Sequence, residues 1–166
     1  MNAEAQEPET SWLTAEERTA WLSLASVLMR LQPALDAQLK RDAGLSHFEY
    51  QILAALSESP ERTLRMSVLA VLAEGSLSRL SYAVGRLEKE QWVRRTPDPA
   101  DGRSTLAILT DAGWGKVVDT APGHVTEVRR LVVDPLTKGQ IRQMTAINER
   151  ILAAIDPNDT CSHVPT

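Results

Sequence analysis

Hydroxyl and guanidinium side chains cluster near the middle of the chain, on one face of a helix that the apolar spacing predicts. Apolar positions recur three, four and three residues apart, so the inner face is expected to comprise Leu77, Leu80, Val84 and Leu87. The opposite face then carries Ser78, Arg79, Ser81, Tyr82 and Arg86, with Ser76 as the N-cap. Arginine binds phosphate oxygens or guanine edges, and short hydroxyls let a helix approach a groove closely. This face has the chemistry of a DNA-reading surface; the alternative is an ordinary solvated helix face.

A second charged cluster lies in a predicted β-hairpin directly after this helix. Residues 92–96 and 104–109 alternate in polarity and are rich in β-branched and aromatic types, with turn-forming residues between them. The tip is expected to be Asp101-Gly102-Arg103, in which Gly102 allows a tight turn and Asp101 holds the Arg103 guanidinium in a fixed direction. Arg103 then enters a narrow minor groove. The alternative is an Asp–Arg pair that only ties the loop together.

Basic residues are concentrated in the segment that contains these two elements. From residue 62 to residue 103, eight basic residues accompany five acidic ones, whereas the whole 166-residue chain carries −4. The segment is therefore +3 and the remainder −7, an asymmetry expected of a DNA-binding protein. Arg94 and Arg95 within it point to opposite faces of a strand, so at most one is expected to meet phosphate, and the candidate is Arg94.

Helix-start signals place these elements within a longer series of helices. In a capping box, a Ser or Thr and a Glu or Gln three residues later satisfy each other's backbone N–H groups. Such boxes begin at Thr14, Ser46 and Thr137. The first helix is expected to bend at Pro33 and to end at Gly44.

The other boundaries follow from capping residues, prolines and glycines. The second helix is expected to begin at His47 and to stop at Ser59-Pro60. A helix-turn-helix then occupies about residues 66–90, and the hairpin follows it. After Thr110, a helix is predicted to run to about residue 133, with an interruption or kink near Pro122-Gly123.

Both ends of the chain are expected to form a helical layer. Apolar seams comprise Trp21, Leu24, Leu28, Leu31, Leu35 and Leu39 near the start and Ile141, Met144, Ile147, Ile151 and Ile155 near the end. Such seams pack against another helix, including one from a second subunit. The predicted fold is mainly α with a small β-hairpin: a winged helix-turn-helix at 45–110, a dimerisation region at 14–44 and 111–156, an N-terminal arm at 1–13 and a tail at 157–166.

A site for a small molecule is indicated only by aromatic side chains. The candidates are Trp12, Trp21, His47, Tyr50 and Trp114. A tryptophan at helical spacing also serves as a core or dimer-seam residue. The sequence therefore names candidates for an effector cleft without identifying the effector.

Nothing in the sequence indicates an enzyme, a metal site or a bound cofactor, because catalysis needs clustered nucleophiles, carboxylates or ligands. The three histidines are far apart in sequence, and His124 with Glu127 one turn later supplies only two ligands. The one cysteine, Cys161, allows no internal disulfide, and redox sensing is the alternative to a bystander role. The chain lacks a signal-peptide pattern and any apolar run near the ~18 residues of a membrane span, so a cytoplasmic location is expected.

From the first helix to about residue 155, the chain resembles the MarR family of winged-helix transcriptional regulators. The most specific matches are SLSRLS at 76–81, RLE at 86–88, WVRR at 92–95 and DGRSTLAILTDAGW at 101–114. The resemblance implies a homodimer joined by its first and last two helices, with the 76–90 helix in a major groove and the Arg103 wing in the neighbouring minor groove. It also implies a repressor that a small, often aromatic molecule releases from DNA. A two-fold symmetric dimer implies a pseudo-palindromic operator. The alternative is a winged-helix protein-interaction module with weak or partner-dependent DNA binding.

Two positions depart from the family pattern. Gly85 lies inside the predicted recognition helix, where glycine costs about 0.5–1 kcal/mol relative to alanine. Gln91 stands where a glycine usually ends that helix, and a left-handed conformation there strains glutamine. We expect Gly85→Ala or Gln91→Gly to bind the operator more tightly than the natural chain.

Overall fold

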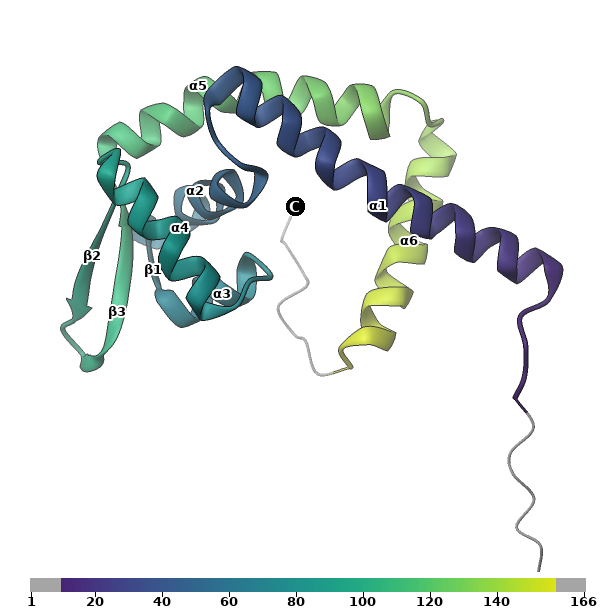
Figure 1. Cartoon of the computed structure of the whole chain (residues 1–166), viewed down its shortest axis with the longest axis horizontal. Coiled ribbons are helices and arrows are strands. Elements are labelled where there is room, and N and C mark those ends of the chain that lie inside the picture. Colours follow the sequence, from purple (N-terminus) through teal and green to yellow (C-terminus); the bar gives the residue numbers. More distant parts are fainter. Residues whose placement is uncertain (1–9, 158–166) are drawn as a thin grey trace, which may run out of the picture.

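The computed structural model describes residues 10–157 and is mainly helical (Figure 1). Two long helices, α1 (Ala15–Ala43) and α5 (Asp111–Val128), pack against each other and form an arch. The arch lies over a smaller lobe made of α2 (His47–Glu58), α3 (Met66–Leu72), α4 (Leu77–Lys89) and a sheet. The last helix, α6 (Lys138–Ile155), descends from the far end of the arch. No helix of residues 10–157 combines the length and the hydropathy needed to cross a membrane.

The three predicted capping boxes are confirmed. The backbone N–H of Thr14, Ser46 and Thr137 donates to the side chain three residues later at 2.7, 2.8 and 2.9 Å. Each hydroxyl accepts a backbone N–H in return. Ser76 and Thr110 cap α4 and α5 as expected. These local bonds set where five of the helices begin.

The sheet is larger than the predicted hairpin. It has three antiparallel strands in the order β1-β3-β2, formed by β1 (Thr63–Arg65), β2 (Val93–Asp98) and β3 (Asp101–Leu109). Strand β1 was not predicted, because three residues are too short to show an alternating pattern. It pairs with β3 through Thr63 opposite Ile108. It thereby joins the start of α3 to the hairpin.

The tip of the wing differs from the prediction. Both strands extend further than expected, and the turn consists of Pro99 and Ala100, because the carboxylate of Asp98 accepts the backbone N–H of Ala100 at 2.9 Å. Arg103 is therefore the third residue of β3 rather than a tip residue. Gly102 is not in the left-handed region, so a tight turn does not require it.

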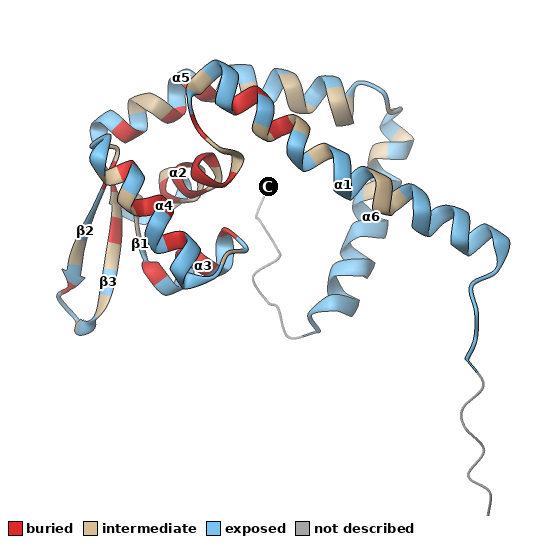
Figure 2. Ribbon diagram, viewed as in Figure 1, coloured by how far each residue is buried: buried red, intermediate tan, exposed pale blue. Residues whose placement is uncertain are grey.

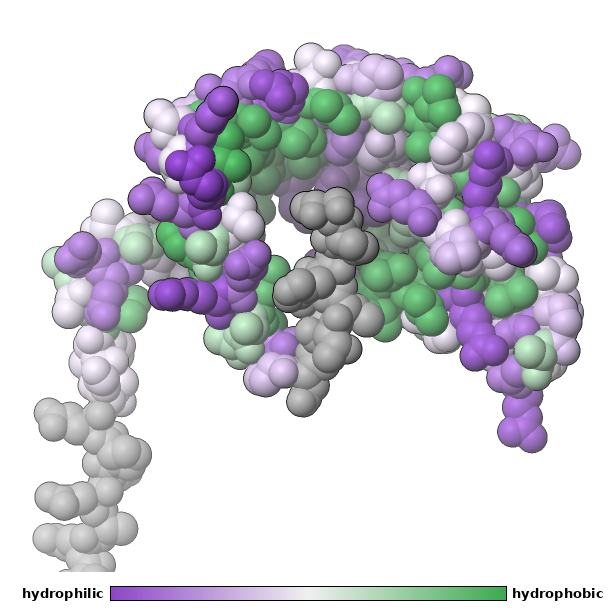
Figure 3. Space-filling view, turned by 180° about the vertical axis from the view of Figure 1, so that it is seen from behind, coloured by the Kyte–Doolittle hydropathy of each residue, from purple (hydrophilic) through white to green (hydrophobic). Residues whose placement is uncertain are grey.

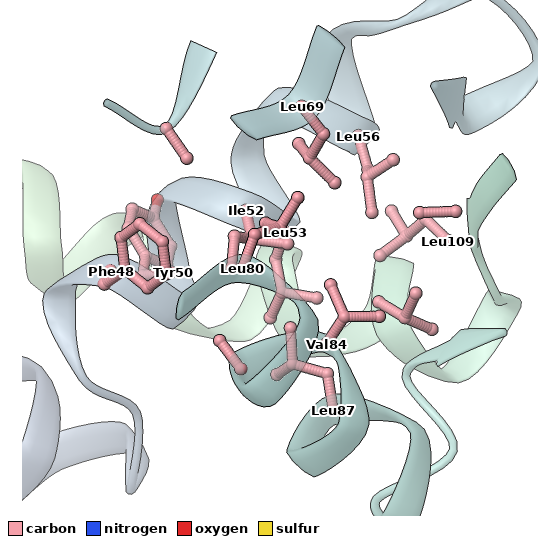
Figure 4. Packing of buried hydrophobic residues seen from close by; sticks show 14 of the residues in the cluster. Phe48, Tyr50, Ile52, Leu53, Leu56, Leu69, Leu80, Val84, Leu87 and Leu109 are labelled. Atoms are coloured by element: carbon pink, nitrogen blue, oxygen red, sulfur yellow. The ribbon is translucent and has the colours of Figure 1, made fainter. Parts of the chain in front are cut away.

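The hydrophobic core lies between α2, α4 and the sheet (Figure 4). Its fully buried side chains include Leu39, Leu45, Ile52, Leu53, Leu56, Leu69, Leu80, Val84, Leu87 and Val93. The expected inner face of α4 is confirmed except at its first residue, since Leu77 is 57% exposed. The buried arc of α4 is completed by Ala83 instead. Leu77 lies at the edge of that arc, in the first turn of the helix.

The helix α1 ends, as expected, at its C-cap Gly44, whose φ of 69° is left-handed. It continues through Pro33, and the bend expected at that residue stays a prediction. The interruption of α5 near Pro122 is not found, because α5 continues through that residue, and the alternative of a kink there stays a prediction. The irregular segment lies further on, where Arg129–Val133 forms a π-helical turn. A wider turn of this kind accommodates a change of direction without a proline.

Two other helix ends use left-handed residues that are not glycine. Gln91 has φ 60° and follows α4, where its N–H donates to Glu88 and that of Trp92 donates to Leu87. Glu74 has φ 49° and follows α3 in the same arrangement. In this C-terminal motif the left-handed position favours glycine. The expectation of strain at Gln91 is therefore confirmed in its geometry.

Apolar side chains remain exposed on the outer helices of the single chain. The exposed members of the predicted seams and their neighbours include Trp21, Leu22, Leu28, Met29, Ile147, Ile151, Leu152 and Ile155. No described residue of α6 is buried (Figure 2). Hydrophobic side chains are exposed along the arch in the space-filling view (Figure 3). Only the last part of the α1 seam, at Leu35 and Leu39, is buried within one chain.

Candidate nucleic-acid interface

The exposed side of α4 divides into a crest and two flanks. One residue advances by about 100° around an α-helix, so the crest opposite the buried arc carries Ser78, Tyr82, Gly85 and Lys89. Tyr82 is 74% exposed, and Ser78 and Lys89 are also exposed. Ser81 lies on the flank toward the wing, whereas Arg79 and Arg86 lie on the flank toward α2.

A hollow of about 290 Å³ separates the wing-side flank of α4 from the hairpin. Its walls come from α3, α4 and both strands of the wing, and comprise Met66, Ser67, Leu77, Ser81, Arg95, Arg103, Ser104 and Thr105. The structure thus brings two predicted site residues, Ser81 and Arg103, to one surface. In Figure 1 the wing projects beside α4 on the same side of the lobe.

Asp101 does not hold the guanidinium of Arg103, which corrects the prediction. Its carboxylate accepts the backbone N–H of Arg103 at 3.1 Å and the hydroxyl of Ser104 at 2.8 Å. These hydrogen bonds lower the pKa of Asp101 below its usual value, and the one from Ser104 has the larger effect. Within residues 10–157 the Arg103 side chain has no hydrogen-bond or ion-pair partner. Asp101 therefore shapes the backbone and leaves the guanidinium free to bind another molecule.

The two consecutive arginines of β2 have different environments. Arg95 forms an ion pair with Glu88 of α4 at 2.6 Å and donates to Ser81 at 3.3 Å. The hydrogen bond between Arg95 and Glu88 lowers the pKa of Glu88 and raises that of Arg95. Arg94 is exposed, and no partner for it exists among the described residues. Of the pair, Arg94 is the one left available for an outside ligand.

A second ion pair fastens the wing to the start of the helix-turn-helix. Arg65, the last residue of β1, donates to Asp98 at 2.8 Å, and the Asp98 side chain is buried. Asp98 also closes the hairpin turn through Ala100. One carboxylate therefore fixes both the shape of the wing and its position relative to α3.

Arg79 and Arg86, two of the predicted DNA contacts, both lie against α2. The Arg79 guanidinium lies over the ring of Phe48, 4.0 Å from its centroid. The Arg86 Nε lies 3.2 Å from Glu49, whose side chain is 5% exposed. Both arginines are thus held against α2, whereas Tyr82 on the crest has no hydrogen-bond or ring partner among residues 10–157.

The arginine flank also borders a larger cleft of about 570 Å³ between α1, α2 and α4. Its lining includes Gln32, Asp36 and Lys40 from the arch and Arg79, Tyr82 and Arg86 from α4. Of the five aromatic effector candidates, His47 lines this cleft. A molecule in the cleft touches the helix that carries the DNA-reading chemistry.

The other four aromatic candidates lie elsewhere, so the structure does not bring the set together. Trp12 and Trp21 are exposed near the start of α1. Tyr50 is buried, with its ring 4.7 Å from that of His124. Trp114 lies beneath the guanidinium of Arg62, 4.3 Å away. Helical spacing did not distinguish these surroundings, because each depends on contacts between distant elements.

Two histidines that are far apart in sequence meet where α2 packs on α5. The rings of His47 and His124 lie 5.8 Å apart, and their Nδ1 atoms contact Gln32 and Gln38 at 3.2 Å each. Burial lowers the pKa of both imidazoles.

The neighbouring Glu127, the other residue considered as a metal ligand, forms an ion pair with Arg130 at 2.7 Å. No group of three or more His, Cys, Asp or Glu within residues 10–157 is placed to hold a metal ion. Cys161 and His163 lie outside the described residues.

Sequence reasoning missed several residues of this surface. Lys89 shares the crest with Ser78 and Tyr82, and its position one turn after Gly85 could have revealed it. Ser67 and Thr105 line the hollow from α3 and β3. Their placement depends on how the wing packs beside the helices, for which the local sequence carries no signal.

Comparison with known proteins gives one consistent family. The sequence profile described as the MarR family matches residues 43–104. Sco3205 of Streptomyces coelicolor, a MarR family transcriptional regulator whose crystal structure is a complex with DNA, is 46% identical. The match covers 92% of this chain and 96% of that one, with a TM-score of 0.87.

Two further relatives agree with this result. AbsC of Streptomyces coelicolor, also a MarR family transcriptional regulator, is 35% identical with a TM-score of 0.83, covering 88% of this chain and 98% of that one. The HTH-type transcriptional regulator MhqR of Bacillus subtilis is 26% identical over 134 residues, which span 78% of this chain and 90% of that protein. The similarity thus extends through the lobe and the arch.

Proposed function

The chain belongs to the MarR family of transcriptional regulators, and we propose that it binds a pseudo-palindromic DNA operator as a homodimer. One observation carries this proposal: the wing-side flank of α4 and the unpaired Arg103 border the same hollow. A helix that reads base edges and a strand that enters the adjacent groove must present their side chains to one duplex. The DNA-bound state of the similar Sco3205 supports the assignment.

In the proposed complex α4 lies in the major groove. Ser76, Ser78, Arg79, Ser81, Tyr82 and Arg86 are the predicted contacts there, and the crest adds Lys89. Hydroxyl and ammonium groups bind phosphate oxygens, whereas an arginine is suited to guanine. Arg103 and Arg94 serve the wing, with Asp101 shaping its backbone. The hollow between α4 and the wing then faces the duplex where the major groove meets the sugar-phosphate backbone that separates the two grooves.

The exposed apolar faces of α1 and α6 support the dimer. A helix without buried residues and with Ile147, Ile151, Leu152 and Ile155 on its surface needs a partner in water. We assign residues 14–44 and 111–156 to dimerisation and 45–110 to DNA binding. The two recognition helices are then expected to lie roughly 34 Å apart, one turn of duplex.

We further propose repression that is relieved by a small molecule in the cleft between α1, α2 and α4. The cleft has a volume of about 570 Å³, which suits a drug-sized ligand. Arg79 and Arg86 form part of its wall, so a ligand there competes for the side chains that hold α4. A regulator of this kind acts in the cytoplasm.

The test has two steps. The full-length protein first selects a duplex from a randomised library, and its affinity for that duplex is then measured by titration. We expect binding of the dimer, an affinity loss of at least about 10³-fold between ~50 and ~200 mM salt, and weaker binding to the same duplex with scrambled half-sites. Sedimentation of the free protein measures the oligomeric state. A shallow salt dependence with equal affinity for the scrambled duplex supports the protein-interaction alternative instead.

A further inference from the structure

An exposed leucine stands at the start of the helix proposed to read DNA. Leu77 is the first residue of α4, directly after the cap residue Ser76, and 57% of it is accessible to solvent. The first residues of a recognition helix are the ones that reach base edges. We infer that Leu77 is a specificity residue that packs on the 5-methyl group of a thymine in the major groove, an inference that rests on the proposed function.

The surroundings of Leu77 in the hollow are mostly polar, and Met66, the other apolar residue of the lining, is buried. The hollow that it lines is otherwise bordered mainly by hydroxyl and guanidinium groups, including Ser67, Ser81, Arg95 and Arg103. Ser81 and Arg95 are already bonded to each other, and Arg95 is also paired with Glu88. Leu77 is therefore an apolar spot on a surface built to meet a polyanion.

Charge determines which partner fits this spot. An apolar protein surface docking here brings the free guanidinium of Arg103, across the same hollow, into a dry contact, which is costly. Duplex DNA instead supplies phosphates for Arg103 and offers one apolar group on a base edge of the major groove, the thymine methyl. A leucine beside serines and arginines matches that combination.

The inference predicts a readout that depends on a single methyl group. In the duplex recovered from the randomised library, each thymine is replaced in turn by deoxyuridine, which keeps every hydrogen-bonding group and removes only the methyl. For the natural protein, we expect one position in each half-site at which the replacement lowers affinity by roughly fourfold, the contribution of one buried methyl-sized group. For Leu77→Ala, we expect that same position to become insensitive to the replacement.

Val71→Ser is the matched control, because Val71 is another exposed apolar residue of the helix-turn-helix and does not line the hollow. It is expected to keep the dependence on the thymine methyl. Circular dichroism melting checks that Leu77→Ala and Val71→Ser remain folded. Equal affinity of the natural protein for all deoxyuridine duplexes overturns the inference, as does an unchanged deoxyuridine effect in Leu77→Ala. Failure of the natural protein to bind the unmodified duplex overturns the proposed function itself, and the inference with it.

Discussion

The Glu49 carboxylate at the start of α2 lies 3.2 Å from the Nε of Arg86 in α4, and it also accepts both the backbone N–H and the hydroxyl of Ser46. One buried side chain thus caps a helix and anchors the recognition helix to it. Because the carboxylate is almost inaccessible, its partners cannot be replaced by water without rearrangement.

We expect Glu49→Gln to destabilise the protein by about 1 kcal/mol, because glutamine retains a cap acceptor and loses the ion pair with a half-exposed arginine. Glu49→Ala also removes the acceptor for the backbone N–H of Ser46, which is half of the capping box, and is expected to cost about 2–3 kcal/mol. Urea unfolding at constant salt measures both changes. Equal stability of Glu49→Gln and Glu49→Ala contradicts the proposed division between cap and anchor.

Arg103→Ala is expected to weaken operator binding by about 1–3 kcal/mol, with the larger loss on A/T-rich flanks, where the minor groove is narrow. The physical reason is the free guanidinium beside the hollow. Arg62→Ala is the control, since Arg62 is already engaged by Asp111 at 3.1 Å and by Trp114. Comparable losses for the two variants in an anisotropy titration argue against a special role for Arg103.

Arg79→Ala is expected to act through the major groove. It should lower the ratio of operator to non-specific affinity and leave the salt slope nearly unchanged, whereas Arg94→Ala should reduce the slope by about one phosphate contact. Because Arg79 rests on the ring of Phe48, Phe48→Leu should reproduce part of the effect by releasing the guanidinium. A uniform loss on every DNA sequence reassigns Arg79 to the phosphate backbone.

Gln91→Gly is expected to stabilise the protein by about 0.5–1 kcal/mol, because φ of 60° disfavours a side chain with a Cβ. Thermal and urea unfolding measure the gain. The neighbouring Glu90 has φ −82°, so Glu90→Gly should destabilise instead. Gln91→Gly and Gly85→Ala should also tighten operator binding, because both stabilise α4. A methyl group at position 85 fits without a clash, since its nearest neighbour is Arg95 at 4.0 Å. A gel-shift titration without a gain for either contradicts this part.

The histidine pair predicts a loss of stability below neutral pH. Burial lowers the pKa of His47 and His124 in the folded state below the usual value of a histidine, and repulsion from His47 lowers that of His124 further. The unfolded chain then binds protons first as pH falls through that value, so stability is retained above it and decreases below it until the lowered folded pKa is reached. Urea unfolding between about pH 7 and pH 5 measures this slope. His124→Gln should flatten it, and an identical slope in that variant excludes the pair as the cause.

Much of the fold could be predicted because its signals are local. Capping boxes at Thr14, Ser46 and Thr137 set helix starts, and apolar spacing identified α1, α4 and α6. The short strand β1 and the position of the turn at Pro99 were not predicted, because both depend on pairing with another strand of the sheet. Pro122 misled because a proline side chain can be accommodated in a helix that packs well elsewhere.

The sequence predicted which residues form the candidate site better than it predicted which contacts those residues make. Ser81 and Arg103 follow from the pattern, and the structure brings them together. That Arg79 and Arg86 face α2 could not be foreseen, because Phe48 and Glu49 lie in a different helix, with β1 and α3 between the two helices in the chain. Leu77 was assigned to the core because its spacing fits the helical period, although it lies at the edge of the buried arc of α4 and is exposed.

The wing ends beyond its arginine. Asp98 and Asp101 are opposite each other in the strand register, with a two-residue turn between them, so Arg103 is the third residue after the turn. Its backbone N–H donates to the Asp101 carboxylate. Because Arg103 lies within β3 and not in the turn, lengthening or shortening the turn is expected to change how far the wing extends past Arg103 while leaving the arginine in place. The length of the wing and the position of its arginine can therefore vary independently.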